Sequence, residues 1–416
     1  MIPLERFSLG VGDRFGRQAR AQLRAVKALE ARGVRVAPVW NKSFREHSLI
    51  GTQPTDTRRA ADAAVAAEQW KGGYFVDADH ISLKNVDAFI PACDFFTLDV
   101  ADFIGQPVAA DEARAFARRH AGLAGSLAID GIGRPLVLDD AALEAIASRY
   151  LAAIRAAGSL YRHIAARRTA PFVTEVSMDE TAAPQTPAEL LVILAGLADE
   201  NLPLQTIAPK FTGAFHKGID YVGDPAVFAR EFDEDLCVLR HAVARFGLPA
   251  TLKLSVHSGS DKFSLYPPMA AALRRRESGV HLKTAGTTWL EEVIGLAAAG
   301  GEGLAMAKTI YRTARPRFET LRVPYASVVS IDPDRLPAPA EVEGWSSEAF
   351  VGALEHNPSH PRFNRDFRQF IHISFRVAAE MGARFTDALA AHAETIGAHV
   401  TRNLLDRHLK PLFLEP

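Results

Sequence analysis

The chain has 416 residues, of which 48% are hydrophobic and 23% are charged, and its formal net charge is −1 at pH 7. A nearly neutral chain without a domain-wide basic excess is not expected to bind nucleic acid. It has two cysteines, no apolar signal core at its N-terminus and no apolar run of the ~20 residues that a membrane helix needs, so we expect a cytoplasmic protein that does not enter a membrane.

Short apolar segments that resemble β-strands recur along the chain, and most of them end in a polar or charged cluster. The predicted strands are Phe7–Gly12, Val34–Trp40, Tyr74–Val76, Phe95–Val100, Phe172–Val176, Gln205–Ala208, Thr251–Val256 and Val280–Leu282. Helical segments rich in Ala, Leu, Arg and Glu lie between them, which favours βαβ units and a parallel sheet. The predicted helices are Arg17–Arg32, Thr57–Trp70, Pro187–Glu200, Pro225–Phe246 and Pro268–Glu277. An open doubly wound sheet would explain the alternation too, but a set of eight strands favours a closed TIM-type (β/α)8 barrel in the α/β class.

Two regions depart from this alternation. The stretch Asp102–Arg168 is longer than a simple crossover and carries predicted helices at Asp111–His120 and Asp140–Arg162, which indicates an insertion after the fourth strand. From Trp289 onward the strand pattern stops, and the predicted helices are Leu290–Ala299, Arg362–Met381 and Ala388–Leu405. We therefore expect a barrel domain over residues 1–300 and a C-terminal helical extension over residues 301–416 that packs on the barrel.

The segment 251–261 shows how such a barrel would build a site. Read with a period of two, it has polar side chains on one face, including Lys253 and His257, and leucine and valine on the other. A strand of this kind fits a barrel whose apolar residues pack under the outer helices and whose polar residues face the site. Because barrel active sites lie at the carboxyl ends of the strands, we expect the polar groups there to carry the chemistry.

Histidines at these strand ends predict a metal site. His80, His216 and His257 follow three different strands, and three neutral imidazoles can hold a divalent cation such as Zn, Mn, Ni or Co while leaving positions open for a substrate. Each histidine taken alone has a structural, hydrogen-bonded alternative. Three histidines together at one rim of the barrel favour the metal site over the structural alternative.

Carboxylates at the same rim predict proton transfer. Asp79 lies beside His80 at a strand tip, and Glu175 is expected to point inward from the fifth strand. Two carboxylates from different strands can work on opposite faces of one substrate. The alternative is that one of them is a metal ligand or orients a histidine.

Basic residues near the strands predict an anionic small-molecule substrate. The expected substrate-binding residues are Arg14, Lys42, Asp179, Lys210, Lys253 and Lys283. The alternative is that these lysines form structural ion pairs within the barrel. A homo-oligomer is compatible with all of these observations.

Longer strings in the chain resemble the tagaturonate epimerase family. The resemblance covers most of the chain from Phe7 to about Glu292 and includes YFVDADHI, EVSMDET, QTIAPKFTGAFHKGIDYVGD, LKLSVHSGSDKFSLYP and HLKTAGTTWLEE. It implies an isomerase that interconverts D-tagaturonate and D-fructuronate with a divalent metal, and some members resemble tagatose 4-epimerases. Carried onto the matching positions, it implies metal binding by His80, His216 and His257 and acid/base roles for Asp79 and Glu175.

The chemistry that such an enzyme needs follows from the two sugar acids, which differ at C4 in ketose numbering. Because C4 is β to the C2 carbonyl, simple enolisation acidifies C3 and cannot invert C4, whereas a retro-aldol cleavage of C3–C4 followed by re-addition can. Two other functions remain open from the sequence. One is an aldolase, metal-dependent or with Lys283 or Lys253 as a Schiff-base amine, and the other is a sugar-acid binding protein without turnover.

Overall fold

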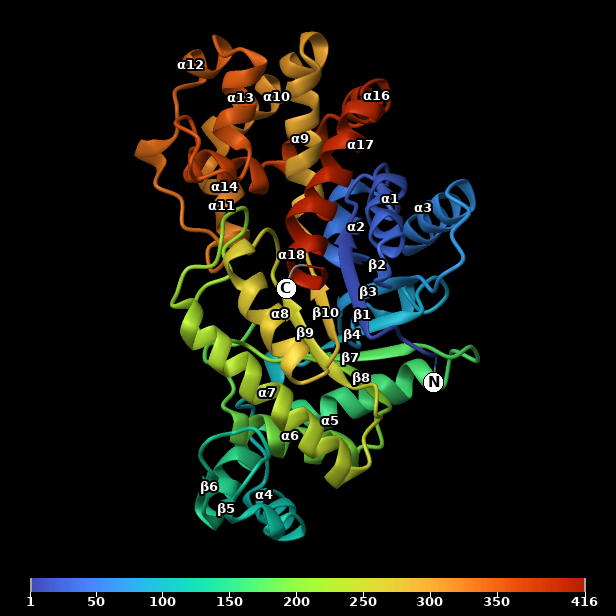
Figure 1. Ribbon diagram of the computed structural model, residues 1–416, viewed down its shortest axis with the longest axis vertical. Helices are drawn as coiled ribbons and strands as arrows, with labels where there is room; N and C mark the ends of the chain where they lie inside the picture. Colours follow the sequence, from blue (N-terminus) through green and yellow to red (C-terminus); the bar gives the residue numbers. More distant parts are fainter. Residues whose placement is uncertain (1, 415–416) are drawn as a thin grey trace.

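The structure of the chain is a computed structural model that describes residues 2–414. Within these residues, eight parallel strands form a closed barrel in the order β1-β10-β9-β8-β7-β4-β3-β2, which confirms the predicted fold (Figure 1). The strands are β1 (Phe7–Gly12), β2 (Ala37–Ser43), β3 (Phe75–Ile81), β4 (Phe95–Asp99), β7 (Val173–Ser177), β8 (Leu204–Ala208), β9 (Lys253–His257) and β10 (Val280–Lys283). Each overlaps a predicted strand; β2 and β3 extend further toward their polar ends than their apolar residues indicate.

The barrel interior changes from apolar to polar along its axis. At the amino end a small buried cluster fills the interior and contains Leu4, Ala37, Val39, Phe75, Phe95 and Val173. Since alternate residues of a strand share a face, the next inward residues on β3, β4 and β7 are Asp77, Thr97 and Glu175. The apolar layer therefore seals one end of the barrel, and a polar layer lies above it toward the carboxyl ends of the strands.

The outer helices cover the barrel with the apolar faces that the sequence predicts. They are α1 (Ala19–Glu30), α2 (Phe44–Ile50), α3 (Pro54–Ala67), α5 (Asp140–Ala165), α6 (Pro187–Asp199), α7 (Pro225–Phe246) and α8 (Tyr266–Arg275). The outward residues Leu254 and Val256 of β9 belong to the large core between strands and helices. Several helices begin with a sequence-encoded cap: the hydroxyl of Thr186 accepts from the backbone N–H of Glu189 at the start of α6.

The insertion after β4 consists of α4 (Ala110–Arg119) and a small antiparallel hairpin, β5 (Gly125–Leu127) with β6 (Leu136–Leu138). It lies at the opposite end of the molecule from most of the C-terminal helices (Figure 1). The sequence predicts the insertion and its helices but not the hairpin, whose strands are only three residues long. The long helix α5 then returns the chain to the barrel.

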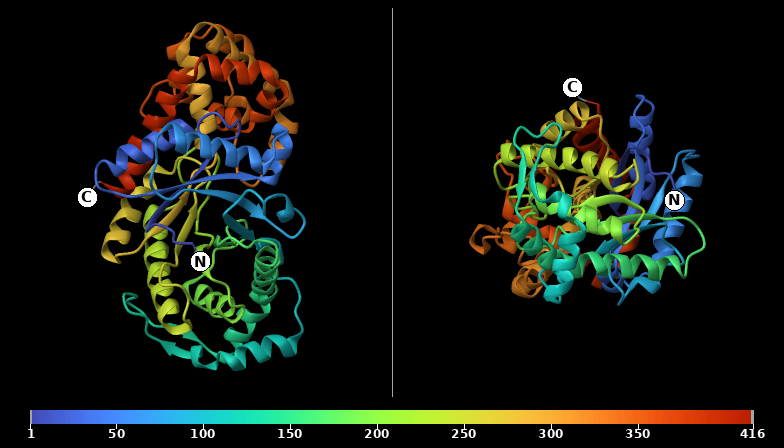
Figure 2. Two further views of the ribbon diagram at one scale, coloured as in Figure 1. Left: turned by 90° about the vertical axis from the view of Figure 1, so that its right-hand side faces the viewer. Right: turned by 90° about the horizontal axis from the view of Figure 1, so that it is seen from below.

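The C-terminal region is helical, as predicted, and it packs on the last barrel helix α9 (Thr287–Ala299). It contains α10 (Gly301–Ala314), α11 (Phe318–Arg322), α12 (Pro339–Glu343), α13 (Ser347–Leu354), α14 (Arg365–Ile373), α15 (Phe375–Glu380), α16 (Ala383–Ala391), α17 (Ala393–Arg402) and α18 (Lys410–Phe413). Most of this region forms one end of the molecule, with the teal insertion at the other end (Figure 2). Because α9 belongs to both the barrel and the helical packing, a domain boundary at residue 300 stays a prediction.

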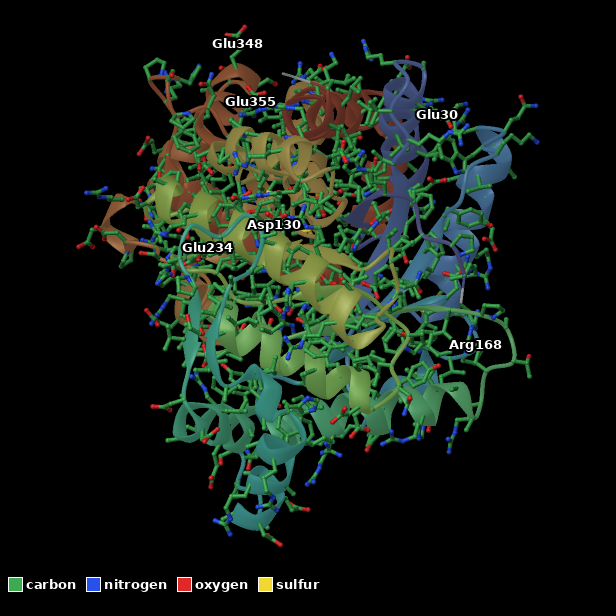
Figure 3. All side chains as sticks on the ribbon, turned by 60° about the horizontal axis from the view of Figure 1, so that its bottom comes forward. Glu30, Asp130, Arg168, Glu234, Glu348 and Glu355 are labelled. Carbon is green, nitrogen blue, oxygen red and sulfur yellow. The ribbon has the colours of Figure 1, made fainter. Side chains whose placement is uncertain are left out.

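The predicted single helix Arg362–Met381 is divided at Ser374 into α14 and α15, which lets His372 and Phe375 project from different helices. A π-helical turn, Asn403–Leu409, then carries the chain back to the barrel, where the rings of Phe413 and Phe7 lie 4.7 Å apart. Exposed charged side chains such as Glu348 point outward from this region (Figure 3). Among residues 2–414 we find no helix that combines the length and apolarity needed to span a membrane.

Candidate active site at the carboxyl ends of the barrel strands

A buried lysine stands at the centre of the polar layer. The Nζ atom of Lys283, at the end of β10, lies 2.8 Å from Asp77 Oδ2, 2.9 Å from Asp79 Oδ1 and 2.9 Å from Glu175 Oε1. Its aliphatic stem crosses Gly10 of β1 so closely that a Cβ there would lie 2.8 Å from Lys283 Cγ. Three buried carboxylates against one ammonium leave a surplus of negative charge, which favours a further cation nearby.

His257 lies directly above this cluster at the end of β9, in register with Lys283. Its Nε2 atom is 2.9 Å from Glu175 Oε1, and its Nδ1 atom is 3.1 Å from Asp179 Oδ1. The second contact lacks hydrogen-bond geometry, so the buried Nδ1 has no hydrogen-bond partner among residues 2–414. Glu175 therefore orients the ring so that Nδ1 faces Asp179.

His80 faces His257 across the mouth of the barrel, with the ring centroids 5.1 Å apart. Its Nδ1 atom is 3.2 Å from Asp99 Oδ2, and its Nε2 atom is 4.0 Å from Asp79 Oδ1. The backbone of His80 has φ 50°, in the left-handed region that non-glycine residues rarely adopt, at a register shift between β3 and β4. Strain of this kind is characteristic of functional sites.

The two histidines and Asp179 fit a divalent cation. One ligand atom from each of His80, His257 and Asp179 lies within 4.8 Å of the others. In each histidine one ring nitrogen contacts a carboxylate outside the group, Asp99 for His80 and Glu175 for His257, as is usual for metal-binding imidazoles. Two imidazoles and a carboxylate suit Zn, Mn, Co or Ni and leave positions open for substrate oxygens.

The surrounding charges raise the pKa values of both histidines. Burial lowers the pKa of His80, but the carboxylates of Asp79 and Asp99 outweigh it and raise the value to about 10. Burial acts likewise on His257, where Asp179 and Glu175 raise the pKa to about 9. Since a metal ligand must be a neutral imidazole, binding of a cation here displaces protons from the rings.

The buried carboxylates differ in their proton affinity. Burial raises the pKa of Asp77 to about 7, aided by the charges of Asp79 and Glu175. For Asp79 burial acts in the same direction, but Lys283 and the neighbouring histidines outweigh it and lower the pKa to about 2. Lys283 and His257 likewise hold the pKa of Glu175 well below its usual range despite burial. Of these three carboxyl groups, Asp77 is the one whose pKa is raised above its ordinary value.

The sequence-based list of site residues omits Asp77, although the strand pattern contains a signal for it. Asp77 and Asp79 are two residues apart on β3 and so share its inward face. The structure confirms this by placing both carboxylates on Lys283.

His216 does not join the cation group, which among the described residues comprises His80, His257 and Asp179. It lies well beyond the end of β8 at Ala208, on a loop that turns toward the C-terminal helices, where the N–H of Lys217 donates to the carbonyl of Val328. The structure therefore does not bring His216 to the other two predicted ligands, and Asp179, which the sequence suggested for substrate binding, lies beside them instead.

The predicted basic residues lie in different places. Lys253 is at the amino end of β9, where its Nζ donates to the carbonyls of Glu5 and Arg6, so its assignment to substrate binding is wrong. Lys42 and Lys210 lie near the rim but donate to protein oxygens, Lys42 to Arg14 O at 2.6 Å and Lys210 to Asp179 O at 3.3 Å. Lys283 is at the centre but is enclosed by carboxylates. Of the predicted cations, Arg14 alone keeps an unpartnered donor, its buried Nη1, within residues 2–414.

Comparison with known proteins gives a consistent result. Residues 2–410 match the family model described as tagaturonate epimerase. The chain is 30% identical over 420 residues to the tagaturonate/fructuronate epimerase of Thermotoga maritima, covering 96% of this chain and 80% of that protein. A glycerol-complexed crystal structure of the fructuronate–tagaturonate epimerase of Cohnella laeviribosi matches with a TM-score of 0.81 and 26% identity, covering 99% of this chain and 82% of that one. The native structure of the same enzyme matches with a TM-score of 0.80 and 25% identity, over 99% and 82% of the two chains.

Proposed function

Since the chain belongs to the tagaturonate epimerase family, we propose that it interconverts D-tagaturonate and D-fructuronate with the help of a bound divalent cation. One observation carries the proposal beyond the family match. At the carboxyl ends of the strands, His80 and His257 each contact a further carboxylate, and one ligand atom of each lies within 4.8 Å of one from Asp179.

We propose that His80 Nε2, His257 Nδ1 and a carboxylate oxygen of Asp179 hold the cation. A divalent cation at this position would act as a Lewis acid for negative charge that develops on the C2 oxygen of the substrate. Glu175 is fully buried, and both its oxygens are engaged, with His257, Lys283, Thr97 and Thr206 as partners. This favours a role in orienting His257 over direct contact with the substrate.

Asp79 is the residue that we propose to exchange the substrate hydroxyl proton. It lies at the tip of β3, and its Oδ1 atom is 4.0 Å from His80 Nε2 and 2.9 Å from Lys283 Nζ. Lys283 keeps the carboxylate ionised, which is the form that can accept a proton. Asp77, whose pKa is raised to about 7, shares Lys283 with Asp79 and could store the proton during turnover.

The reaction that these groups support is a retro-aldol cleavage followed by aldol addition. Asp79 takes the proton from the C4 hydroxyl, the C3–C4 bond breaks, and its electron pair moves into an enediolate spanning C2 and C3. C4 becomes an aldehyde carbon. After the aldehyde has turned over its other face, the C3–C4 bond re-forms, and the alkoxide at C4 regains a proton. No electrons are gained or lost overall, so the reaction needs no redox cofactor.

The structure lends no support to a Schiff-base aldolase. A Schiff base requires a neutral amine. Burial lowers the pKa of Lys283, but Asp77, Glu175 and Asp79 outweigh it and hold the value well above that of a free lysine. Burial does lower the pKa of Lys253, to about 7, but Lys253 lies at the amino end of the barrel.

Tagatose and fructose differ at C4 in the same way as the two sugar acids, but they lack the carboxylate. The family resemblance implies them as further substrates, and we propose the sugar acids as the main ones because cations lie near the rim.

The proposal is tested by incubating the purified protein with D-tagaturonate and following the 4-epimer by NMR. We expect turnover to be lost on dialysis against a chelator and restored by one of Mn²⁺, Co²⁺, Ni²⁺ or Zn²⁺. Full activity of the chelated protein would overturn the metal role. Free three-carbon fragments in place of the epimer would identify an aldolase, and binding without any product would identify a sugar-acid binding protein.

A further inference from the structure

A lysine outside the site described above lies on the same rim. Lys217 follows β8, and a Cβ added to Gly259, two residues beyond His257, would lie 2.9 Å from its Nζ atom. The loop is fixed on both sides of the side chain, because the N–H of Lys217 donates to Val328 O at 2.7 Å and the N–H of Gly218 donates to Ser260 Oγ at 2.9 Å. The ammonium group is therefore held beside the loop that follows the metal-binding strand β9.

Lys217 differs from the other rim lysines in having an unused charge. Within the described part of the chain its Nζ donates to no protein oxygen and forms no ion pair, whereas Lys42, Lys210 and Lys283 all do. The side chain is only partly exposed. Burial lowers the pKa of Lys217, and the nearby guanidinium of Arg14 lowers it further, against the opposing effect of Glu180.

Arg14 is the second cation with an unused donor. Its Nε atom is 2.9 Å from Glu46 Oε1, and its guanidinium stacks on the ring of Phe375 at 4.0 Å, so the side chain is held rigidly. Arg14 is only 6% exposed, yet its Nη1 atom has no hydrogen-bond partner in the range 2–414. A buried donor of a charged group without a partner is costly, and such groups commonly serve a ligand.

The C-terminal helices form the wall behind these two cations. His372 of α14 is fully buried against Gly286, where its Nε2 atom would lie 2.1 Å from an added Cβ, and the N–H of Gly286 donates to Gly259 O at 2.9 Å. Neither ring nitrogen of His372 has a partner among the residues described. Gly259 thus adjoins Lys217, Gly286 lies between Gly259 and His372, and Phe375 of α15 supports Arg14.

We propose that Lys217 and Arg14 bind the carboxylate of the sugar acid, in a subsite that the C-terminal helices complete. The inference rests on the proposed function, since it concerns the end of the same substrate that is remote from C2. A carboxylate offers oxygens to both cations in charge-assisted hydrogen bonds. A neutral sugar with a hydroxymethyl group at this end would leave both cations unpaired, so the subsite selects sugar acids over ketohexoses.

The test measures binding of D-tagaturonate and D-tagatose to the metal-loaded protein by calorimetry. Lys217→Met is expected to weaken D-tagaturonate binding about 10- to 100-fold, the usual effect of losing one charged hydrogen bond. It should leave the affinity for D-tagatose and the metal content unchanged. Lys217→Arg should recover part of the loss, and Lys71→Met, which removes the same charge from an exposed position before β3, should change neither affinity.

Unchanged binding of D-tagaturonate by Lys217→Met would overturn the proposal, and so would an equal loss for both sugars, because that result indicates a structural role. The proposed function fails separately. If the wild-type protein binds D-tagaturonate through Lys217 but forms no epimer, the carboxylate subsite is supported and the proposed epimerase activity is refuted. A wild-type protein that does not bind D-tagaturonate would refute both.

Discussion

The role of Glu175 gives the sharpest test of the site. Glu175→Gln keeps the size of the side chain but removes the charge that faces His257 Nε2 at 2.9 Å. If Glu175 orients a metal-binding histidine, the variant should lose metal affinity by about 10- to 100-fold, or ~1.4 to ~2.7 kcal/mol, the range found for carboxylates that support metal-binding histidines. If Glu175 instead transfers a proton, metal affinity should be unchanged and turnover alone should fall.

The two outcomes are separated by titrating Mn²⁺ and Zn²⁺ into the chelator-treated protein in competition with a metal indicator, and by measuring kcat at saturating metal. Glu189→Gln is the matched control, because Glu189 is a buried carboxylate on α6 that contacts Arg149 and Tyr150 and does not belong to the cation group. We expect the control to bind metal like the wild type. Wild-type metal affinity in Glu175→Gln would refute the reasoning.

Three other predictions follow from the same contacts. His257→Ala should lose both bound metal and epimerase activity with an unchanged circular dichroism spectrum, and an active variant would remove His257 from the site. Lys253→Met should keep the wild-type kcat/KM, because Lys253 Nζ contacts backbone carbonyls at the amino end of the barrel. A large loss of kcat/KM would show that Lys253 takes part in substrate binding after all. Asp261→Asn should lower the free energy of unfolding by roughly 3–5 kcal/mol, because it removes the buried negative charge that lies 2.7 Å from Arg368 Nη2. The loss is measured from the shift of the denaturant midpoint. Burial raises the pKa of Asp261, but Arg368 and two histidines outweigh it and hold the value well below 3.8, so its stabilisation is present above about pH 4 and is lost as the pH falls through the lowered pKa. The Asn variant should lack this part of the acid sensitivity, and an identical pH profile would contradict the prediction.

Strand and helix positions were predictable because each is a local property. Short apolar segments that end in polar clusters identified all the barrel strands, and α7 was predicted with the bounds that the structure gives, Pro225–Phe246. Elements with weak local signals were missed or misjudged. The three-residue strands β5 and β6 are too short for a pattern, and the division between α14 and α15 at Ser374 leaves the helical periodicity almost unchanged.

The site was predictable where residues stand on strands. Alternation fixes the face of Glu175, Lys283 and His257, and parallel strands bring their carboxyl ends to one rim. It was not predictable on loops, because a loop has no fixed period. His216 and Asp179 both follow strand ends, yet the loop after β8 carries His216 away while Asp179 stays 3.1 Å from His257.

The sequence by itself determined the eight strands, their polar carboxyl ends and the resemblance to an epimerase family, because periodicity and long matching strings are properties of the chain in order. Tertiary structure decided which groups meet. It paired Lys283 with three carboxylates from two other strands, sent Lys253 to the opposite end of the barrel, and brought Arg14 against Phe375 of the C-terminal helices. Contacts between residues distant in sequence depend on strand register, loop direction and packing, and none of these is written in a local pattern.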